Sequence, residues 1–176
     1  MRLLLALLVA SLLGSPADRY ADVTINADGS VTVGTEDGRH LTPPRLAPYA
    51  QDGKNVGAEQ AAVSPDHQSV GWLALFENCC TSYPLPLTLV ILHNGRSHSF
   101  EGIAPIWFWS FQNGGERVAT REEAPHGGER IHYDLWDVAS GKRVADFTPE
   151  YDEDGQTRPN EPAWVKALDA AEAKSR

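Results

Sequence analysis

The sequence predicts an all-β fold with two tandem four-stranded antiparallel sheets, an N-terminal hairpin and a short C-terminal helix. Short apolar clusters rich in β-branched and aromatic residues alternate with turn residues through most of the chain. These clusters recur in the same order at a nearly constant spacing. A helical apolar pattern is found only near the C-terminus.

Residues 1–17 have the pattern of a secretory signal peptide. Arg2 precedes an apolar stretch over residues 3–13, and the small residues Ser15 and Ala17 stand at the positions of a cleavage site. The stretch is much shorter than the roughly 20 apolar residues that span a membrane. We expect cleavage after Ala17, a periplasmic or secreted location, and no membrane span in the processed chain, which folds as a single β-rich domain over residues 18–176.

The chain is acidic, with 24 Asp and Glu, 15 Lys and Arg, and a formal net charge of −9. Its cationic residues are dispersed along the sequence and form no run. Nucleic-acid binding depends on clustered cations that neutralise phosphates. We therefore expect no nucleic-acid partner.

The segment 22–41 is expected to form the N-terminal hairpin. β-Branched residues alternate on both sides of Asp28 and Gly29, a dipeptide that favours the tight turn of a two-stranded hairpin. Residues 42–58, which contain several Pro and Gly, are expected to form a loop.

Two units of four apolar clusters each make up the middle of the chain, at residues 59–100 and 106–147. Turn residues such as Asn, Asp, Gly and Ser separate the clusters. The clusters of the first unit occupy residues 61–63, 70–76, 87–92 and 97–100, and those of the second occupy residues 106–111, 118–121, 131–138 and 143–147.

The two units correspond to each other position by position. Val63 falls on Phe111 at a shift of 48 residues, and Asn94 falls on Ser140 at a shift of 46. A repeat of about 47 residues with four short strands is the period expected of β-propeller blades.

Two short segments carry a family resemblance. Residues 135–142, with the sequence LWDVASGK, resemble the end of a WD40 repeat, where a third strand closes in Trp-Asp and a Ser-Gly turn leads to the fourth strand. Residues 64–66, Ser-Pro-Asp, resemble the turn between the first two strands of WD40 and TolB-type blades. The resemblance covers about residues 59–147 and implies a blade-like scaffold for binding partners.

The length of the chain limits how such units can assemble. A closed propeller needs about four to eight blades, whereas this chain holds about three units of this size at most. We expect either an incomplete propeller or a sandwich-like stack that includes the hairpin. Alternatively, the open sheet edges pair with a second copy of the chain as a homodimer.

Residues 160–173 are expected to form the C-terminal helix. Asn160 is suited to cap the helix, and Trp164, Leu168 and Ala171 share one apolar face. We expect this face to lie over a sheet or over an open end of the stack.

The only two cysteines, Cys79 and Cys80, are adjacent. Neighbouring Cα atoms lie about 3.8 Å apart, below the usual disulfide range of about 4.4–6.8 Å. A bond between them would be strained and easily reduced. It would act as a loop clamp or redox-sensitive element, and the alternatives are two reduced thiols or an intermolecular bridge.

Aromatic residues gather near the long loops of the two units. Tyr83 lies in the long loop of the first unit, and alternation places Trp107 and Trp109 on one face of the next strand. The tryptophans form either a core stripe where the sheets meet or a stacking surface for a peptide or glycan.

Equivalent loops of the two units are expected to lie at the same rim. Such a rim would bring Cys79, Cys80 and Tyr83 close to His126 and His132. We therefore expect a non-catalytic binding or scaffold protein that uses no cofactor and takes a protein, peptide or glycan partner. The predicted binding residues are Tyr83, Trp107, Trp109, His126 and His132.

An alternative function is a metal-dependent hydrolase that uses His126, His132 and an acidic residue such as Glu122 or Glu123. A zinc site needs further ligands, and the sequence contains no His-Glu-x-x-His motif. Loop histidines that bond to backbone groups are the simpler interpretation.

The acidic segment 150–161 matches several ligand positions of a calcium-binding loop. However, Arg158 occupies the ninth position, and a strand precedes the segment where an EF-hand has a helix. A solvated acidic linker is expected instead.

Overall fold

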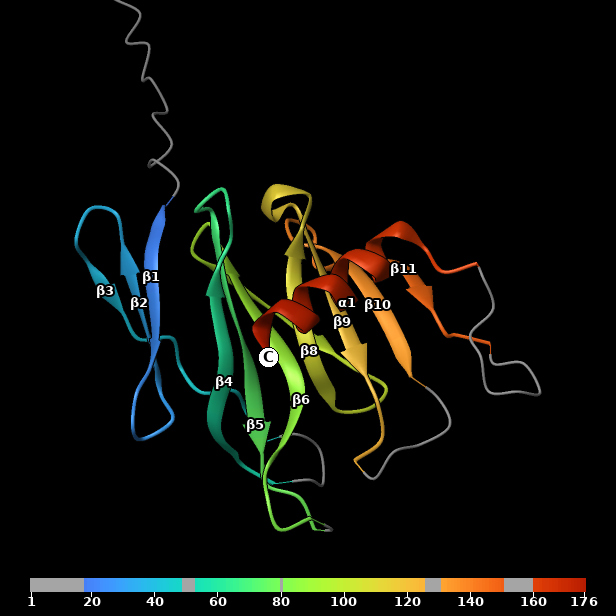
Figure 1. Cartoon of the computed structure of the whole chain (residues 1–176). Helices are drawn as coiled ribbons and strands as arrows, with labels where there is room; N and C mark the ends of the chain where they lie inside the picture. Colours follow the sequence, from blue (N-terminus) through green and yellow to red (C-terminus); the bar gives the residue numbers. More distant parts are fainter. Residues whose placement is uncertain (1–17, 49–52, 80, 126–130, 151–159) are drawn as a thin grey trace, which may run out of the picture.

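The computed structural model describes residues 18–48, 53–79, 81–125, 131–150 and 160–176. In this part of the chain, eleven strands form three antiparallel sheets, and one α-helix follows them (Figure 1). The expected all-β fold with two tandem four-stranded sheets is confirmed. The expected signal segment 1–17 lies outside the described residues.

The N-terminal sheet has three strands, β1 (Tyr20–Ile25), β2 (Val31–Thr35) and β3 (His40–Leu41). The expected hairpin turn is present, with a φ of 77° at Gly29, a backbone conformation that favours glycine. The carboxylate of Asp28 accepts a hydrogen bond from the Ser30 N–H at 2.9 Å, which closes the turn. β3 adds a short third strand that the sequence did not indicate.

The second sheet consists of β4 (Asn55–Val63), β5 (Ser69–Phe76), β6 (Leu85–His93) and β7 (Arg96–Glu101), in that order. β4 begins inside the segment that was expected to be a loop. Ala58 pairs with Ala74 of β5. The loop expectation is therefore wrong for residues 55–58, because cross-strand pairing overrides their Gly content.

The third sheet repeats this topology with β8 (Ile106–Gln112), β9 (Arg117–Glu122), β10 (His132–Asp137) and β11 (Lys142–Phe147). A short 3-10 turn, η1 (Asn113–Gly115), joins β8 to β9. β11 begins and ends 46 residues after β7, which is the shift expected from the sequence. The second and third sheets are thus one antiparallel meander formed twice.

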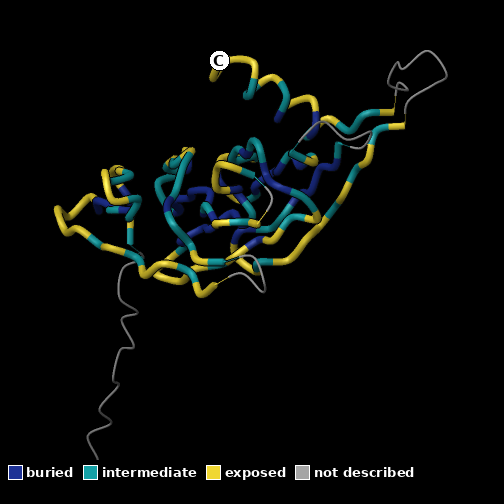
Figure 2. Tube along the Cα trace, turned by 90° about the horizontal axis from the view of Figure 1, so that it is seen from below, coloured by how far each residue is buried: buried dark blue, intermediate teal, exposed yellow. Residues whose placement is uncertain are grey.

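The three sheets stack face to face, and a hydrophobic layer lies between neighbouring sheets (Figure 2). β5 contributes to both layers because successive side chains of a strand point to opposite faces. Val70 and Trp72 pack toward the first sheet, whereas Leu73 packs toward Ile106 and Trp109 of the third. This two-sided burial explains the nearly continuous apolar sequence of β5.

The C-terminal helix α1 (Ala163–Ser175) covers the outer face of the third sheet. Val165 and Leu168 are fully buried against Tyr133 and Leu135 of β10. The helix thus takes the position that a further sheet would occupy, and the stack remains open. The N-cap is Pro162 and not the expected Asn160, and it makes no side-chain capping bond.

Gly71 of β5 allows the second and third sheets to approach closely. A Cβ atom at this position would lie 2.4 Å from Ile91 Cδ1 and 2.6 Å from Trp109 Cη2. Because real Cβ atoms do not approach other atoms so closely, only glycine leaves room for the Trp109 ring here.

The first strands of the three sheets, β1, β4 and β8, lie on the same side of the stack (Figure 1). β1 packs beside β4, although the two strands are not joined in one sheet. Among the described residues, the structure contains no helix with the length and apolarity needed to cross a membrane.

Candidate functional site

A groove of about 680 Å³ lies between β4 and β8. Residues 60–63 of β4 and residues 107–111 of β8 form its walls, and the last turn of α1 closes one side. Most of its lining is apolar, and its volume lies within the range of about 300–1,000 Å³ that is usual for ligand sites. This groove is the strongest candidate site in the described part of the chain.

Gln60 connects the two walls of the groove. It lies at a bulge where the pairing of β4 with β5 shifts between Glu59 and Ala62, and its φ is 50°. Its side-chain Nε2 donates a hydrogen bond to the carbonyl of Trp107 at 2.8 Å, and its own carbonyl accepts one from the Trp109 indole at 2.9 Å. These reciprocal bonds join the edges of two sheets.

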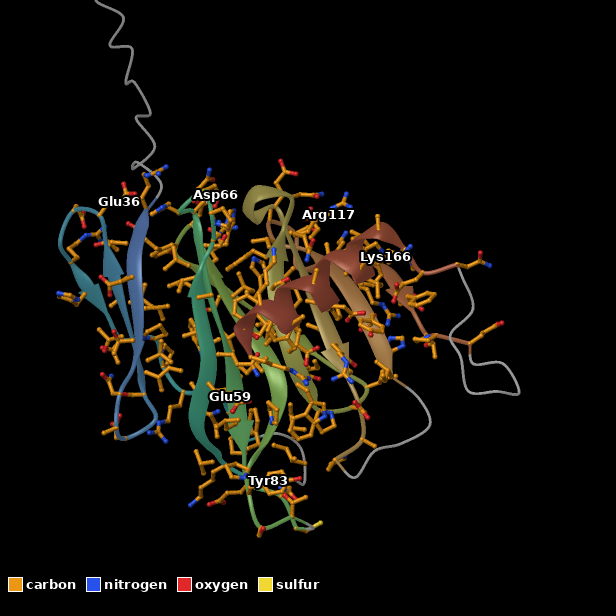
Figure 3. The ribbon with its side chains drawn as sticks, in the orientation of Figure 1. Glu36, Glu59, Asp66, Tyr83, Arg117 and Lys166 are labelled. Carbon is orange, nitrogen blue, oxygen red and sulfur yellow. The ribbon has the colours of Figure 1, made fainter. Side chains whose placement is uncertain are left out.

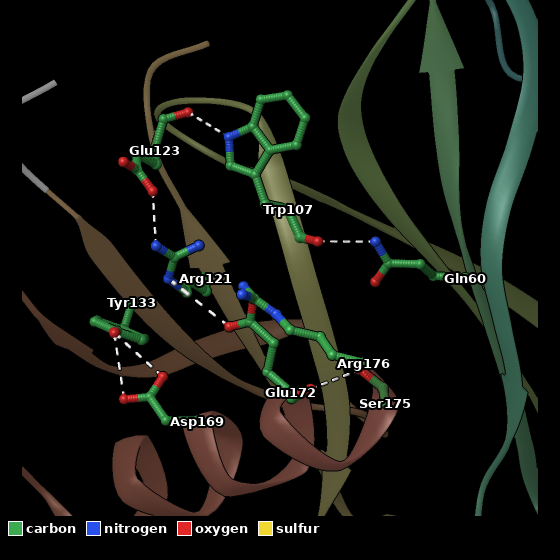
Figure 4. Close-up of polar contacts among 9 residues, drawn as sticks. All are labelled: Gln60, Trp107, Arg121, Glu123, Tyr133, Asp169, Glu172, Ser175 and Arg176. Atoms are coloured by element: carbon green, nitrogen blue, oxygen red, sulfur yellow. Dashed lines mark hydrogen bonds and ion pairs between the residues drawn. The ribbon is translucent and has the colours of Figure 1, made fainter. Parts of the chain in front are cut away.

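Trp107 is held from two directions. It lies at a second bulge, where the pairing of β8 with β9 shifts between Ile106 and Phe108. Its indole Nε1 donates a hydrogen bond to the carbonyl of Glu123 at 2.8 Å (Figure 4), while its own carbonyl is bonded to Gln60. The ring is therefore fixed before any ligand arrives.

Charged side chains form a rim beside Trp107 (Figure 4). The Arg121 guanidinium lies 2.7 Å from the Glu123 carboxylate and 3.9 Å from that of Glu172. Glu172 also pairs with Arg176 at 2.6 Å. These pairs connect β9 with the end of α1 and hold the helix against the side of the groove.

A second polar cluster is buried on the face of the third sheet opposite α1. We refer to Thr120, Glu122, His132 and Asp134 as the buried polar cluster. Glu122 is fully buried, and its carboxylate accepts hydrogen bonds from the Ile103 N–H at 2.8 Å and the Thr120 hydroxyl at 3.0 Å. Burial raises the pKa of Glu122, and the nearby negative charge of Asp134 raises it further.

Both ring nitrogens of His132 have partners within the protein. Nδ1 lies 2.8 Å from the Thr148 hydroxyl, and Nε2 lies 3.2 Å from the carboxylate of Asp134. Asp134 also accepts a hydrogen bond from Arg143 at 3.2 Å. These hydrogen bonds link β10 to β11 and to Thr148, the residue that follows β11.

The structure brings together only part of the predicted binding set. Trp107 and Trp109 both line the groove, and Trp109 also belongs to the core between the second and third sheets. Tyr83 lies in the loop beyond β5, where its side chain is 42% exposed (Figure 3). No hydrogen bond or ion pair between described residues joins Tyr83 to His132.

Three of the predicted residues fall in or beside undescribed segments. His126 and Cys80 lie outside the described residues. Cys79 is disulfide-bonded, and its pairing with Cys80 stays a prediction.

The described residues contain no group of three His, Cys, Asp or Glu side chains arranged to hold a metal ion. In particular, Glu122 and His132 face Thr120 and Asp134 in the buried polar cluster. Most of the acidic segment 150–161 lies outside the described residues, so its expected character stays a prediction.

Sequence reasoning did not find Gln60 or the groove contribution of α1. The role of Gln60 depends on a bulge with positive φ, and no turn residue marks it in the sequence. The charged rim beside Trp107 depends on contacts between residues about 50 positions apart in the chain, such as Arg121 and Glu172. The apolar and aromatic sequence of β8 was the only available signal.

No protein-family model and no curated protein matches the chain. Among the solved structures that are similar to it, two illustrate the low level of identity. The crystal structure of a eukaryotic initiation factor matches with a TM-score of 0.46 and 14% identity over 80% of this chain and 34% of that one. Hydrazine synthase of Kuenenia stuttgartiensis matches with a TM-score of 0.38 and 16% identity over 84% of this chain and 43% of that one. The chain therefore spans less than half the length of either structure.

Proposed function

We propose that this chain is a non-catalytic binding protein that receives its ligand in the groove between β4 and β8. The main support for this proposal is the pair of hydrogen bonds that join Gln60 to Trp107 and Trp109 and fix both walls of the groove. A site that is rigid before binding loses less conformational entropy when a ligand arrives. Binding of an apolar ligand in this groove would therefore cost little conformational entropy of the protein.

The ionisable groups of the groove support binding in preference to acid–base chemistry. Among its described lining residues only Glu172 and Arg176 ionise, and they form an ion pair with each other. A general acid or base needs a side chain that can exchange a proton with the substrate. The groove instead presents aromatic and small apolar side chains.

The sequence supports two further parts of this proposal. The signal-like segment 1–17 favours export to a periplasm or to the exterior of the cell. The WD40-like segment 135–142 favours a scaffold that binds a protein, peptide or glycan. Pairing with a second copy through open sheet edges is the competing way to bury the same surface.

Ala62 provides a direct test of the groove. It is exposed and lines the groove, so Ala62→Arg should place a long charged side chain in the ligand space and leave the fold intact. Ala21→Arg is a matched control on an exposed alanine of β1, outside the groove. Circular dichroism and thermal melting verify that both variants fold.

The three proteins are immobilised and exposed to an extract of the cells that produce the chain, and the retained material is analysed for protein and carbohydrate. We expect at least one component to be retained by the wild type and Ala21→Arg and lost from Ala62→Arg. Identical retention by all three proteins would contradict binding in the groove. Retention of the chain itself would favour self-association.

A further inference from the structure

We infer that the groove takes an extended apolar peptide segment, which pairs with a strand edge and packs its side chains against β4 and β8. This inference rests on the proposed function and names the class of ligand. A glycan, a compact small molecule and a second copy of the chain are the competing occupants.

The polar side chains of the groove already have partners within the chain. Trp107 and Trp109 use their indole N–H groups on backbone carbonyls, and Gln60 uses its amide in the same way. A glycan site needs polar side chains that are available for the sugar hydroxyls. The groove side chains that are already hydrogen-bonded or ion-paired are Gln60, Trp107, Trp109, Ser110, Glu172, Ser175 and Arg176.

The strand edges of the groove offer a different kind of hydrogen bonding. β4 and β8 are terminal strands of their sheets, and each is paired with a neighbouring strand on one side only. An unpaired edge presents backbone N–H and C=O groups that can accept a further strand. The carbonyls of Gln60 and Trp107 already accept side-chain hydrogen bonds, so a further strand would pair with the other backbone groups of these edges. Backbone pairing with such an edge is a recurrent way to bind extended peptides.

The shape of the groove fits an extended chain. The wall on β8 runs over residues 107–111, and a peptide of about five residues spans the same length at about 3.3 Å per residue. The wall on β4 is built from the small residues Ala61, Ala62 and Val63, opposite the large rings of β8. Alternate apolar side chains of the peptide fill the space above these small residues of β4.

The last turn of α1 contributes charged side chains to the groove. Glu172 and Arg176 line the side of the groove formed by α1, and they pair with each other at 2.6 Å. A balanced ion pair does not select a strongly charged ligand, since each charge is already compensated. Apolar side chains and backbone groups are therefore the features that the site recognises.

A library of random eight-residue peptides displayed on phage tests the inference with the full chain. Peptides are selected on the wild type and counter-selected on Ala62→Arg. We expect enriched sequences with apolar residues at alternate positions. A fluorescent synthetic copy should bind the wild type and Ala21→Arg equally and bind Ala62→Arg at least about tenfold more weakly.

Backbone N-methylation separates strand pairing from simple apolar contact. Methyl groups on alternate peptide nitrogens remove hydrogen-bond donors from one edge of the peptide only, because successive N–H groups of a strand point in opposite directions. We expect one methylation register to reduce binding at least tenfold and the other to leave it nearly unchanged.

Three outcomes would overturn the inference, and they differ in what they imply for the proposed function. Equal binding of both methylated peptides would exclude strand pairing, whereas sensitivity to Ala62→Arg would still support ligand binding in the groove. Failure to enrich any peptide, together with carbohydrate retention that depends on Ala62, would identify a glycan ligand. Peptide binding that is unaffected by Ala62→Arg would contradict the proposed function as well.

Discussion

Single side chains that bond to backbone atoms hold the important turns and edges of this protein. Asp137, the acidic residue of the WD40-like segment, accepts hydrogen bonds from the Ser140 N–H at 2.9 Å and from the Ser140 hydroxyl. Gly141 follows with a φ of 66°, which completes the turn into β11. The segment therefore forms a tight turn that Asp137 and Gly141 hold in place.

We predict that Asp137→Ala destabilises the chain by about 1 kcal/mol, because the two hydrogen bonds from Ser140 lose their acceptor. Urea unfolding followed by circular dichroism measures the difference. Asp137→Asn keeps an acceptor oxygen at the same position and should recover most of the loss. Equal destabilisation by both substitutions would show that the turn does not depend on these bonds.

The buried carboxyl of Glu122 predicts a specific pH dependence of stability. Its pKa is raised by burial and by the charge of Asp134, so the folded chain holds the proton more tightly than the unfolded chain. The stability from this proton is present below the unfolded pKa of about 4.3 and is lost as the pH rises through the folded pKa. Glu122→Gln removes the ionisation and retains groups that can bond to Thr120 and Ile103.

Urea unfolding of the wild type and Glu122→Gln at several pH values from 4 to 8 measures this effect. We expect the free energy of unfolding of the wild type to fall relative to the variant as the pH rises through this window, by roughly 1.4 kcal/mol for each unit of pKa shift. Glu116→Gln, which changes an exposed carboxylate near β9, should leave the pH profile unchanged. Parallel profiles for wild type and Glu122→Gln would contradict the raised pKa.

At the level of strands and helices, the sequence predicted what depends on local pattern. Apolar clusters marked the eight strands of the two units, and the shift between β7 and β11 matched the repeat. Local pattern did not predict β3, which is only two residues long, or the start of β4 within a Gly-containing segment. The bulges at Gln60 and Trp107 were also missed, because they arise from packing between sheets.

Helix α1 depends on the third sheet for much of its stability, since its buried face packs on β10. We predict that Leu168→Ala, at a fully buried position, lowers the free energy of unfolding by about 2–5 kcal/mol. Lys166→Ala, at an exposed position of the same helix, should change it by less than about 0.5 kcal/mol. Similar effects of the two substitutions in urea unfolding would show that the helix contributes little.

The described part of the molecule is a stack of layers that pack mainly against their neighbours. The central sheet has a hydrophobic core on both faces, whereas the N-terminal sheet shares one core with it. α1 terminates the other end of the stack by covering Tyr133 and Leu135. The sequence predicted a C-terminal helix over a sheet or an open end, but it did not indicate that this helix would cover the third sheet.

This layered arrangement predicts an order of local opening. Amide hydrogen exchange followed by mass spectrometry should show the strongest protection in β5 and β6, which are buried on both faces. β1 to β3 should exchange faster, since they can detach without disrupting the other core. Uniform protection across all three sheets would show that the stack opens only as one unit.

The close approach at Gly71 links the interior of the stack to the proposed ligand groove. The bare backbone of Gly71 meets the inner edge of the Trp109 ring, and Trp109 itself forms part of the groove wall. Any side chain introduced at this position would push that ring outward and reshape the groove from behind. Ligand preference in such a protein can therefore change through a substitution that no ligand ever touches.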